Sequence, residues 1–262
     1  MTKFPVCVVV YLTDYCPLKC KHCFLTQQKS LNQNMITFNK LKEILKTLKK
    51  NNVCMIAYTG GDPMINPDIF KILKYTTKLD MLPLLGISGI GINSEIAQQI
   101  YDSGVRCVQI GLNGSNSKLN DNYRGAGTFD EIKKTIHTLQ EKNINVNLSF
   151  CLDKKNYKDL NNMLNFSKSM NAFKVKVEFW KKVNDSTLKE LNKNEIFKIN
   201  EFCIDYMNKN NKIDWIQCAK NETNLTRIHK SSVIIMPNGD VKHNELSVSL
   251  GNIYTSNIDD II

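Results

Sequence analysis

Three cysteines within eight residues carry the most evident chemistry in this sequence. Cys16, Cys20 and Cys23 form a C-x-x-x-C-x-x-C pattern directly after an apolar, β-branched run over residues 7–13. Three thiolates on one tight loop can converge on a single soft metal centre. An iron–sulfur cube is normally held by four thiolates, so three would leave one iron open. Zinc and unpaired thiols are the alternatives, and His22 is the one nearby candidate for a further zinc ligand.

A second motif, GGDP over residues 60–63, follows the next apolar run. Two glycines allow a backbone carbonyl to approach a ligand closely, and an acidic side chain can accept a hydrogen bond from an ammonium group. A lone GGDP is more often a structural turn. Its place one strand after the cysteine loop makes a ligand site the better interpretation.

A third stretch lies between residues 108 and 130. It reads VQIGLNG at 108–114, NYRG at 122–125 and GTFD at 127–130. Arg124 in this stretch has the planar, bidentate donor geometry that suits a carboxylate. The alternative is an arginine on a surface loop.

The elements that would position these motifs alternate regularly. Short β-branched runs and amphipathic helical stretches recur at intervals of about 30 residues up to residue 180, which predicts parallel strands covered by helices, in an open sheet or part of a barrel. We expect the strand cysteines Cys7, Cys54, Cys107 and Cys151 to be small buried residues. The six runs span residues 7–13, 53–59, 81–87, 105–112, 144–152 and 173–180.

Several helix ends are predicted by their capping residues. Thr37 precedes an amphipathic stretch, and Asn66 with Pro67 suggests an N-cap followed by a first-turn proline. Residues 128–131 suggest a capping box, and Gly104 stands where a helix would end.

The pattern changes after residue 180. A helix is predicted over residues 194–208, then an irregular run over 213–230, then two short strands around a Pro-Asn-Gly-Asp turn within 233–244. We therefore expect residues 181–262 to form an appendage with its own small sheet.

Composition excludes several classes of protein. The 262 residues are 42% hydrophobic and 23% charged, as in an ordinary globular protein. No stretch approaches the length of a membrane span, and no signal peptide is evident, so a cytoplasmic protein is expected. The nine cysteines fit a metal site in a reducing compartment better than disulfides. A net charge of +10 suits an acidic partner, whereas dispersed lysines make a nucleic-acid site the less favoured interpretation.

Together these motifs resemble those of the radical S-adenosylmethionine (SAM) enzymes. The resemblance implies an α/β fold, a partial (β/α)6 TIM-like barrel, in which Cys16, Cys20 and Cys23 hold a [4Fe-4S] cluster whose open iron binds SAM. One electron from the cluster would cleave SAM to methionine and a 5′-deoxyadenosyl radical that abstracts a substrate hydrogen.

The same resemblance implies roles for further residues. His22 would pack near adenine and Arg124 would bind the carboxylate of SAM. Gly60, Gly61, Asp62 and Pro63 would bind its amino group, with Asp62 in place of the usual glutamate. Ser88 could reach the ribose, and Gly111 replaces a serine whose hydrogen bond must then be missing or supplied by backbone or water.

The C-terminal hairpin resembles the start of a SPASM or twitch region, which is typical of peptide-modifying members. His243 or Asn244 occupies the position of a cysteine there, and only Cys203 and Cys218 remain upstream as possible ligands of an auxiliary cluster. A degenerate region without a second cluster is therefore favoured. The resemblance thus divides the chain into a barrel over residues 1–180 and an extension over 181–262.

The sequence therefore favours a peptide maturase of the radical SAM class. Its expected partners are a peptide or protein substrate, which could carry an acidic leader, and a flavodoxin or ferredoxin-type electron donor. No membrane partner is expected. The alternatives are a radical SAM enzyme acting on a small molecule, and a non-catalytic iron–sulfur or zinc protein that binds a partner through its basic surface. No acid or base is nominated beyond His229 and His243, and a surface role is favoured for both.

Overall fold

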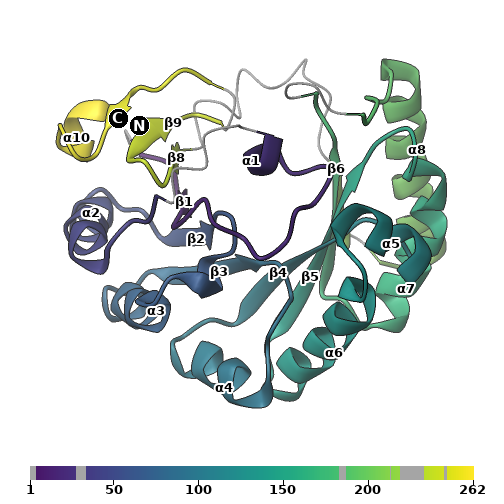
Figure 1. Ribbon diagram of the computed structural model, residues 1–262, viewed down its shortest axis with the longest axis horizontal. Coiled ribbons are helices and arrows are strands. Elements are labelled where there is room, and N and C mark those ends of the chain that lie inside the picture. Colours follow the sequence, from purple (N-terminus) through teal and green to yellow (C-terminus); the bar gives the residue numbers. More distant parts are fainter. Residues whose placement is uncertain (1–3, 28–33, 183–186, 213, 219–232, 245–246) are drawn as a thin grey trace.

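The computed structural model describes residues 4–27, 34–182, 187–212, 214–218, 233–244 and 247–262. Ten strands form a single curled sheet whose outer face is covered by helices (Figure 1). The strand order is β10-β9-β8-β1-β2-β3-β4-β5-β6-β7. The α/β class and the part-barrel arrangement expected from the sequence are thereby confirmed.

Neighbouring strands from β8 to β7 all run parallel. The six strands expected before residue 181 are all present, with ends one or two residues inside the expected runs in most cases. Along them, side chains alternate between full burial under the helices and partial exposure in the hollow of the barrel. The parallel strands are β1 (Cys7–Tyr11), β2 (Met55–Thr59), β3 (Leu82–Ile87), β4 (Cys107–Leu112), β5 (Asn145–Leu152), β6 (Lys174–Phe179), β7 (Ile216–Cys218) and β8 (Val233–Ile235).

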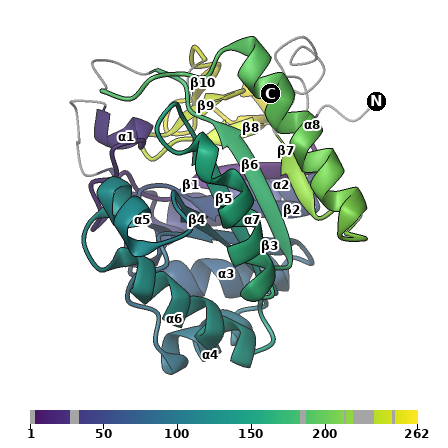
Figure 2. The same cartoon turned by 90° about the vertical axis from the view of Figure 1, so that its right-hand side faces the viewer.

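Helices connect successive strands and pack their apolar faces on the sheet. In α2, for example, Phe38, Leu41 and Leu45 are buried. Two short helices, α1 (Phe24–Gln27) and α5 (Ser117–Arg124), follow β1 and β4 and lie on the same side of the molecule, at the carboxyl ends of the strands (Figure 2). The covering helices are α2 (Phe38–Lys50), α3 (Ile69–Lys78), α4 (Ser94–Asp102), α6 (Thr128–Glu141), α7 (Leu160–Ser169) and α8 (Lys193–Lys209), and the 3₁₀ turns are η1 (Pro63–Ile65) and η2 (Tyr157–Asp159).

The covering helices share one way of ending. A residue with positive φ follows the C-cap of each, which turns the chain toward the next strand. Gly104, expected to end a helix, does so after α4, and the N-cap role expected of Thr37 is confirmed by its acceptance of a hydrogen bond from the Lys40 amide. The positive-φ residues are Asn52, Asp80, Gly104, Asn143, Asn171 and Asn211.

Two helix starts differ from expectation. The capping box over residues 128–131 is wrong, because Thr128 is already helical and Asp121 of α5 accepts hydrogen bonds from the Gly127 and Phe129 amides, at 2.7 and 2.9 Å. Helix α3 begins at Ile69 rather than directly after Asn66. Asn66 still accepts a hydrogen bond from the amide of Asp68, at 2.9 Å.

The C-terminal hairpin is present, but the expectation of a separate small sheet is wrong. Strands β8 and β9 (Asp240–Lys242) are antiparallel and are joined by a turn with Gly239 at φ +90°. Strand β8 also pairs with β1, in register Val9 with Ile234, so the hairpin and β10 (Gly251–Asn252) extend the barrel sheet. The predicted irregular run contains β7, which pairs with β6. The predicted helix is α8, and the short α10 (Ile258–Ile261) closes the described chain.

Within the described ranges, no helix combines the length and the apolar character that crossing a bilayer requires.

Candidate active site and cofactor pocket

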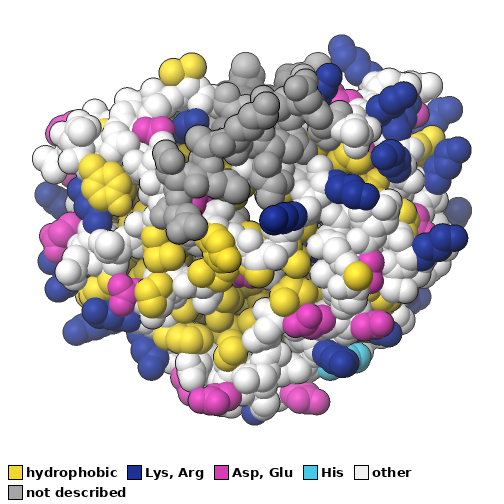
Figure 3. Space-filling view, in the orientation of Figure 1, with side chains coloured by type: hydrophobic (Ala, Val, Ile, Leu, Met, Phe, Trp, Pro, Cys, Tyr) yellow, Lys and Arg dark blue, Asp and Glu magenta, His cyan; other side chains and the backbone are white. Residues whose placement is uncertain are grey.

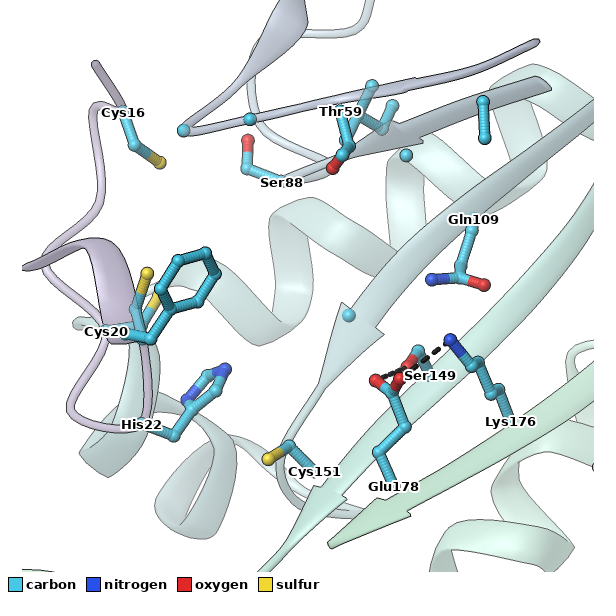
Figure 4. Close-up of a pocket in the computed structure, with 18 of the residues that line it drawn as sticks. Cys16, Cys20, His22, Thr59, Ser88, Gln109, Ser149, Cys151, Lys176 and Glu178 are labelled. Carbon is cyan, nitrogen blue, oxygen red and sulfur yellow. Dashed lines mark hydrogen bonds and ion pairs between the residues drawn. The ribbon is translucent and has the colours of Figure 1, made fainter. Parts of the chain in front are cut away.

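A cavity of about 640 Å³ occupies the hollow of the barrel. Side chains from the cysteine loop and from β1 to β6 face it, as Figure 4 shows for a labelled subset. Asp62 and Pro63 do not line it. The structure otherwise brings together the residues expected from the sequence, namely Cys16, Cys20, His22, Cys23, Gly60, Gly61, Ser88, Gly111 and Arg124.

The two glycines of GGDP support the cysteine loop from behind. The Gly61 amide donates to the Thr13 carbonyl at 2.7 Å, and the Asp62 amide donates to the Tyr15 carbonyl at 2.8 Å. A Cβ atom at Gly61 would lie 2.0 Å from the Tyr15 oxygen, and one at Gly60 would lie 2.3 Å from the Thr13 oxygen. The glycines therefore permit a close backbone contact that fixes the start of the loop carrying Cys16.

Helix α5 holds the other end of the cysteine loop. The amide of Lys21 donates to the Tyr123 carbonyl at 2.9 Å, and its ammonium donates to Asn122 at 2.7 Å. The Tyr123 ring lies 6.3 Å from the ring of His22, and its hydroxyl donates to both carboxylate oxygens of the buried Asp153 at 2.9 Å. The loop is thus connected through Tyr123 to the end of β5.

The cysteine thiols face the cavity in a protein environment that favours their protonated form. Burial raises the pKa of Cys16 to about 12 and also raises the pKa of Cys20. In Figure 4 both side chains point from the loop into the same space. No three Cys, His, Asp or Glu side chains in the described ranges gather closely enough to share one metal ion. A cluster does not require such a gathering, because each thiolate binds a different iron.

His22 is a neutral ring in the wall of the cavity. Burial, with a smaller contribution from the charge of Arg124, lowers the pKa of His22 to about 3. Its Nδ1 atom is buried and has no hydrogen-bond partner among the described residues. A neutral ring of this kind can pack against an aromatic base.

Asp62 lies behind the cavity wall and binds Ser88 rather than facing the hollow. Its carboxylate accepts hydrogen bonds from the Ser88 hydroxyl and, at 3.0 Å, from the Met64 amide. Burial raises the pKa of Asp62, although the Ser88 hydrogen bond counteracts part of that effect. Asp62 therefore positions Ser88, which does line the cavity, and any direct contact of its carboxylate with a ligand would require a movement.

Arg124 reaches the cavity through the space that Gly111 leaves. One guanidinium nitrogen donates to the Ser88 carbonyl at 3.1 Å, and Nε is buried without a partner among the described residues. A Cβ atom at Gly111 would lie 2.8 Å from Nη1 of Arg124. Gly111 thus makes room for the guanidinium group.

These residues fit the cluster and SAM. Three thiols supply the donor set of a cube with one open iron, and the neutral His22 ring and Arg124 offer surfaces for a base and a carboxylate. The residues that would hold the cluster are Cys16, Cys20 and Cys23.

Sequence reasoning missed the polar residues on the opposite wall of the cavity and misjudged four cysteines. Gln109, Asn147, Ser149, Lys176 and Glu178 point into the hollow from β4, β5 and β6. Their signal was a polar residue at every second position of otherwise apolar strands.

The burial expected of the strand cysteines is wrong: Cys107 and Cys151 line the cavity, Cys7 is half-buried and Cys54 is exposed.

The other residues considered for chemistry lie apart from this cavity. Cys203 of α8 is buried and shares a hydrogen bond with Cys218 of β7, which raises the pKa of Cys203. The His243 amide, just after β9, donates to the Ser247 hydroxyl at 3.2 Å. His229 lies outside the described residues.

Comparison with known protein families matches residues 10–167 to the radical SAM superfamily, from β1 to α7. The chain belongs to this superfamily. Its cofactors are accordingly a [4Fe-4S] cluster and SAM, as the family resemblance implied. The matched segment contains the three cysteines, His22 and Arg124, whereas Lys176 and Glu178 of the cavity wall lie beyond it.

Several known proteins resemble this radical SAM chain. AdoMet-dependent heme synthase of Methanosarcina barkeri is 24% identical over 180 residues, which are 68% of this chain and 52% of the relative. Mycofactocin maturase MftC of Mycolicibacterium smegmatis is 30% identical over 135 residues, which are 52% and 34%. The structure of Streptococcus suis SuiB bound to S-adenosylmethionine superposes with a TM-score of 0.83 at 20% identity, covering 99% of this chain and 65% of SuiB. The chain thus spans about half of the heme synthase and about a third of MftC. The likeness to SuiB shows the fold.

Proposed function

We propose that this chain cleaves SAM reductively and removes a hydrogen atom from a peptide or protein substrate, as a peptide maturase. The observation that carries the proposal is the meeting of three cysteines of one loop with Gly61, Ser88 and Arg124 around one cavity. When bound, the cluster and SAM supply a 5′-deoxyadenosyl radical.

The residues of the chain have separate tasks in this proposal. Cys16, Cys20 and Cys23 bind three irons, and Arg124 pairs with the carboxylate of SAM. His22 packs beside adenine as a neutral ring, which costs no buried charge. The barrel wall excludes water and holds the substrate carbon close to the radical position.

A peptide substrate is supported by two relatives and by charge. MftC is a maturase by name, and SuiB has been crystallised bound to its precursor peptide SuiA. The net charge of +10 would attract an acidic leader, and equally an acidic flavodoxin or ferredoxin-type donor. We further propose that residues 181–262 are a degenerate SPASM or twitch-like extension, and that the protein acts in the reducing cytoplasm, where its free cysteines persist.

A small-molecule substrate is the second candidate. The heme synthase of M. barkeri aligns over more of this chain than MftC does. Such a substrate would enter the same cavity and would need the same cofactors.

The test uses anaerobically reconstituted protein with a strong reductant. We expect 5′-deoxyadenosine to form, and a short peptide encoded beside the gene for this protein to lose hydrogen mass or change configuration. A Cys20→Ala variant provides the inactive control. Formation of 5′-deoxyadenosine without any peptide product, together with turnover of a porphyrin, would replace the first candidate by the second.

A further inference from the structure

The cavity has two chemically different walls. Side chains from β1, β2 and β3 that face it are mainly apolar, as in Val9, Ala57 and Leu84. The facing side chains of β4, β5 and β6 are largely polar. We call this set the polar wall, and it consists of Gln109, Asn147, Ser149, Lys176 and Glu178.

An ion pair forms the centre of the polar wall. The Lys176 ammonium lies 2.7 Å from one carboxylate oxygen of Glu178, and the Ser149 hydroxyl donates to the other at 3.1 Å (Figure 4). The side chains of Lys176 and Glu178 are 37% and 41% exposed, so both remain accessible from the cavity. Because the two charges compensate each other and the other members are neutral, the polar wall carries no net charge.

Fold stability does not explain the polar wall. Barrel interiors are usually filled by branched apolar residues, and an ion pair as exposed as this one contributes little to stability. Asn147 adds a buried carbonyl oxygen without a partner among the described residues, which is a cost. A polar ligand that donates a hydrogen bond to this oxygen would remove that cost, so a polar ligand is the better explanation.

We propose that the polar wall binds an uncharged amide segment of the substrate, either peptide main chain or a carboxamide side chain. An amide offers N–H donors and a carbonyl acceptor without charge, which matches a wall that offers both and has no net charge. A polycarboxylate would need an excess of cations, and the two other cations that line the cavity have other partners: Lys181 lies 4.0 Å from Glu190, and Arg124 would pair with the carboxylate of SAM. This inference rests on the proposed function and narrows its substrate class, because it favours a peptide over a carboxylate-rich small molecule.

Binding to the cluster-free protein tests the inference without catalysis. Trp180 lines the cavity, so its fluorescence reports occupancy, and a Trp180→Phe protein shows which part of the signal comes from the cavity. The probes are a pool of N-acetylated, C-amidated pentapeptides of uncharged residues, butane-1,2,3,4-tetracarboxylate, and a pool of free amino acids. We expect the capped peptides to bind roughly tenfold more tightly than the other two probes.

Two variants test the charge balance of the polar wall. Glu178→Gln leaves the Lys176 charge uncompensated, so capped peptides should bind roughly tenfold more weakly while the tetracarboxylate binds more tightly. Lys176→Met should weaken the binding of capped peptides and should not strengthen the binding of the tetracarboxylate. The matched control is the Lys154–Glu195 ion pair, which joins the loop after β5 to α8 outside the cavity, and Glu195→Gln should change no probe affinity.

The outcomes separate this inference from the proposed function. Tighter binding of the tetracarboxylate or the amino acids to the unaltered protein would overturn the inference, as would unchanged affinities in correctly folded Glu178→Gln and Lys176→Met proteins. Failure of the reconstituted protein to form 5′-deoxyadenosine would overturn the proposed function alone, since the binding experiment does not need the cluster.

Discussion

Replacing Gly61 by alanine should weaken the contact between the start of the cysteine loop and residues 60–63. The added Cβ atom would lie 2.0 Å from the Tyr15 oxygen, whereas real Cβ contacts are essentially never below 3.0 Å, so the backbone must move by at least 1.0 Å. The movement disturbs two hydrogen bonds, from Gly61 to Thr13 and from Asp62 to Tyr15. Overpacking costs about 1–3 kcal/mol and each of the two weakened hydrogen bonds about 0.5–1.5 kcal/mol, so we expect a loss of about 2–6 kcal/mol.

Urea unfolding of the cluster-free protein measures this loss, and iron per chain after reconstitution measures the effect on the site. Gly86→Ala is the matched control in the same cavity, because the nearest atom to its Cβ would be the Thr59 hydroxyl at 3.3 Å, and it should cost under about 1 kcal/mol. A Gly61→Ala protein with unchanged stability and full iron content would refute the argument that this glycine fixes the loop.

Three further substitutions test other parts of the site. Tyr123→Phe removes a hydroxyl donor from the buried Asp153 and should lower the free energy of unfolding, measured in urea, by about 1–3 kcal/mol. An unchanged free energy would contradict the conclusion that Tyr123 connects the cysteine loop to the end of β5. Gly111→Ala places a Cβ atom 2.8 Å from Nη1 of Arg124 and should raise the Kd for SAM roughly tenfold in equilibrium dialysis. Burial alone would raise the pKa of Asp121, but its hydrogen bonds from the start of α6 outweigh burial and lower it. Asp121 therefore stabilises the fold above about pH 4 and loses this contribution as the pH falls through its lowered pKa, so Asp121→Asn should flatten the acid dependence of the thermal midpoint.

The fold was largely predictable because its signals are local. Apolar β-branched runs at regular spacing gave six parallel strands, and capping residues such as Thr37 gave helix ends. The capping of α6 was not predictable in this way, because Asp121 is supplied by the preceding helix. The pairing of β8 with β1 joins segments more than 200 residues apart, and no local pattern encodes such a contact.

The candidate site was predictable where a motif concentrates it. The cysteine loop, His22 and Arg124 all reach one cavity, as their motifs indicated. The sequence did not indicate that Asp62 faces Ser88 rather than the cavity, because this orientation depends on packing between β2 and β3. The polar wall is spread over three strands, so its members become a set only when the sheet curls.

The central claim is that this chain holds a SAM-binding [4Fe-4S] cluster through Cys16, Cys20 and Cys23. Anaerobic reconstitution followed by electron paramagnetic resonance of the reduced protein, with and without SAM, tests it most directly. We predict about four irons per chain, a spectrum that changes when SAM is added, formation of 5′-deoxyadenosine, and loss of all three in Cys20→Ala. Bound zinc, or a cluster whose spectrum ignores SAM, would contradict the claim.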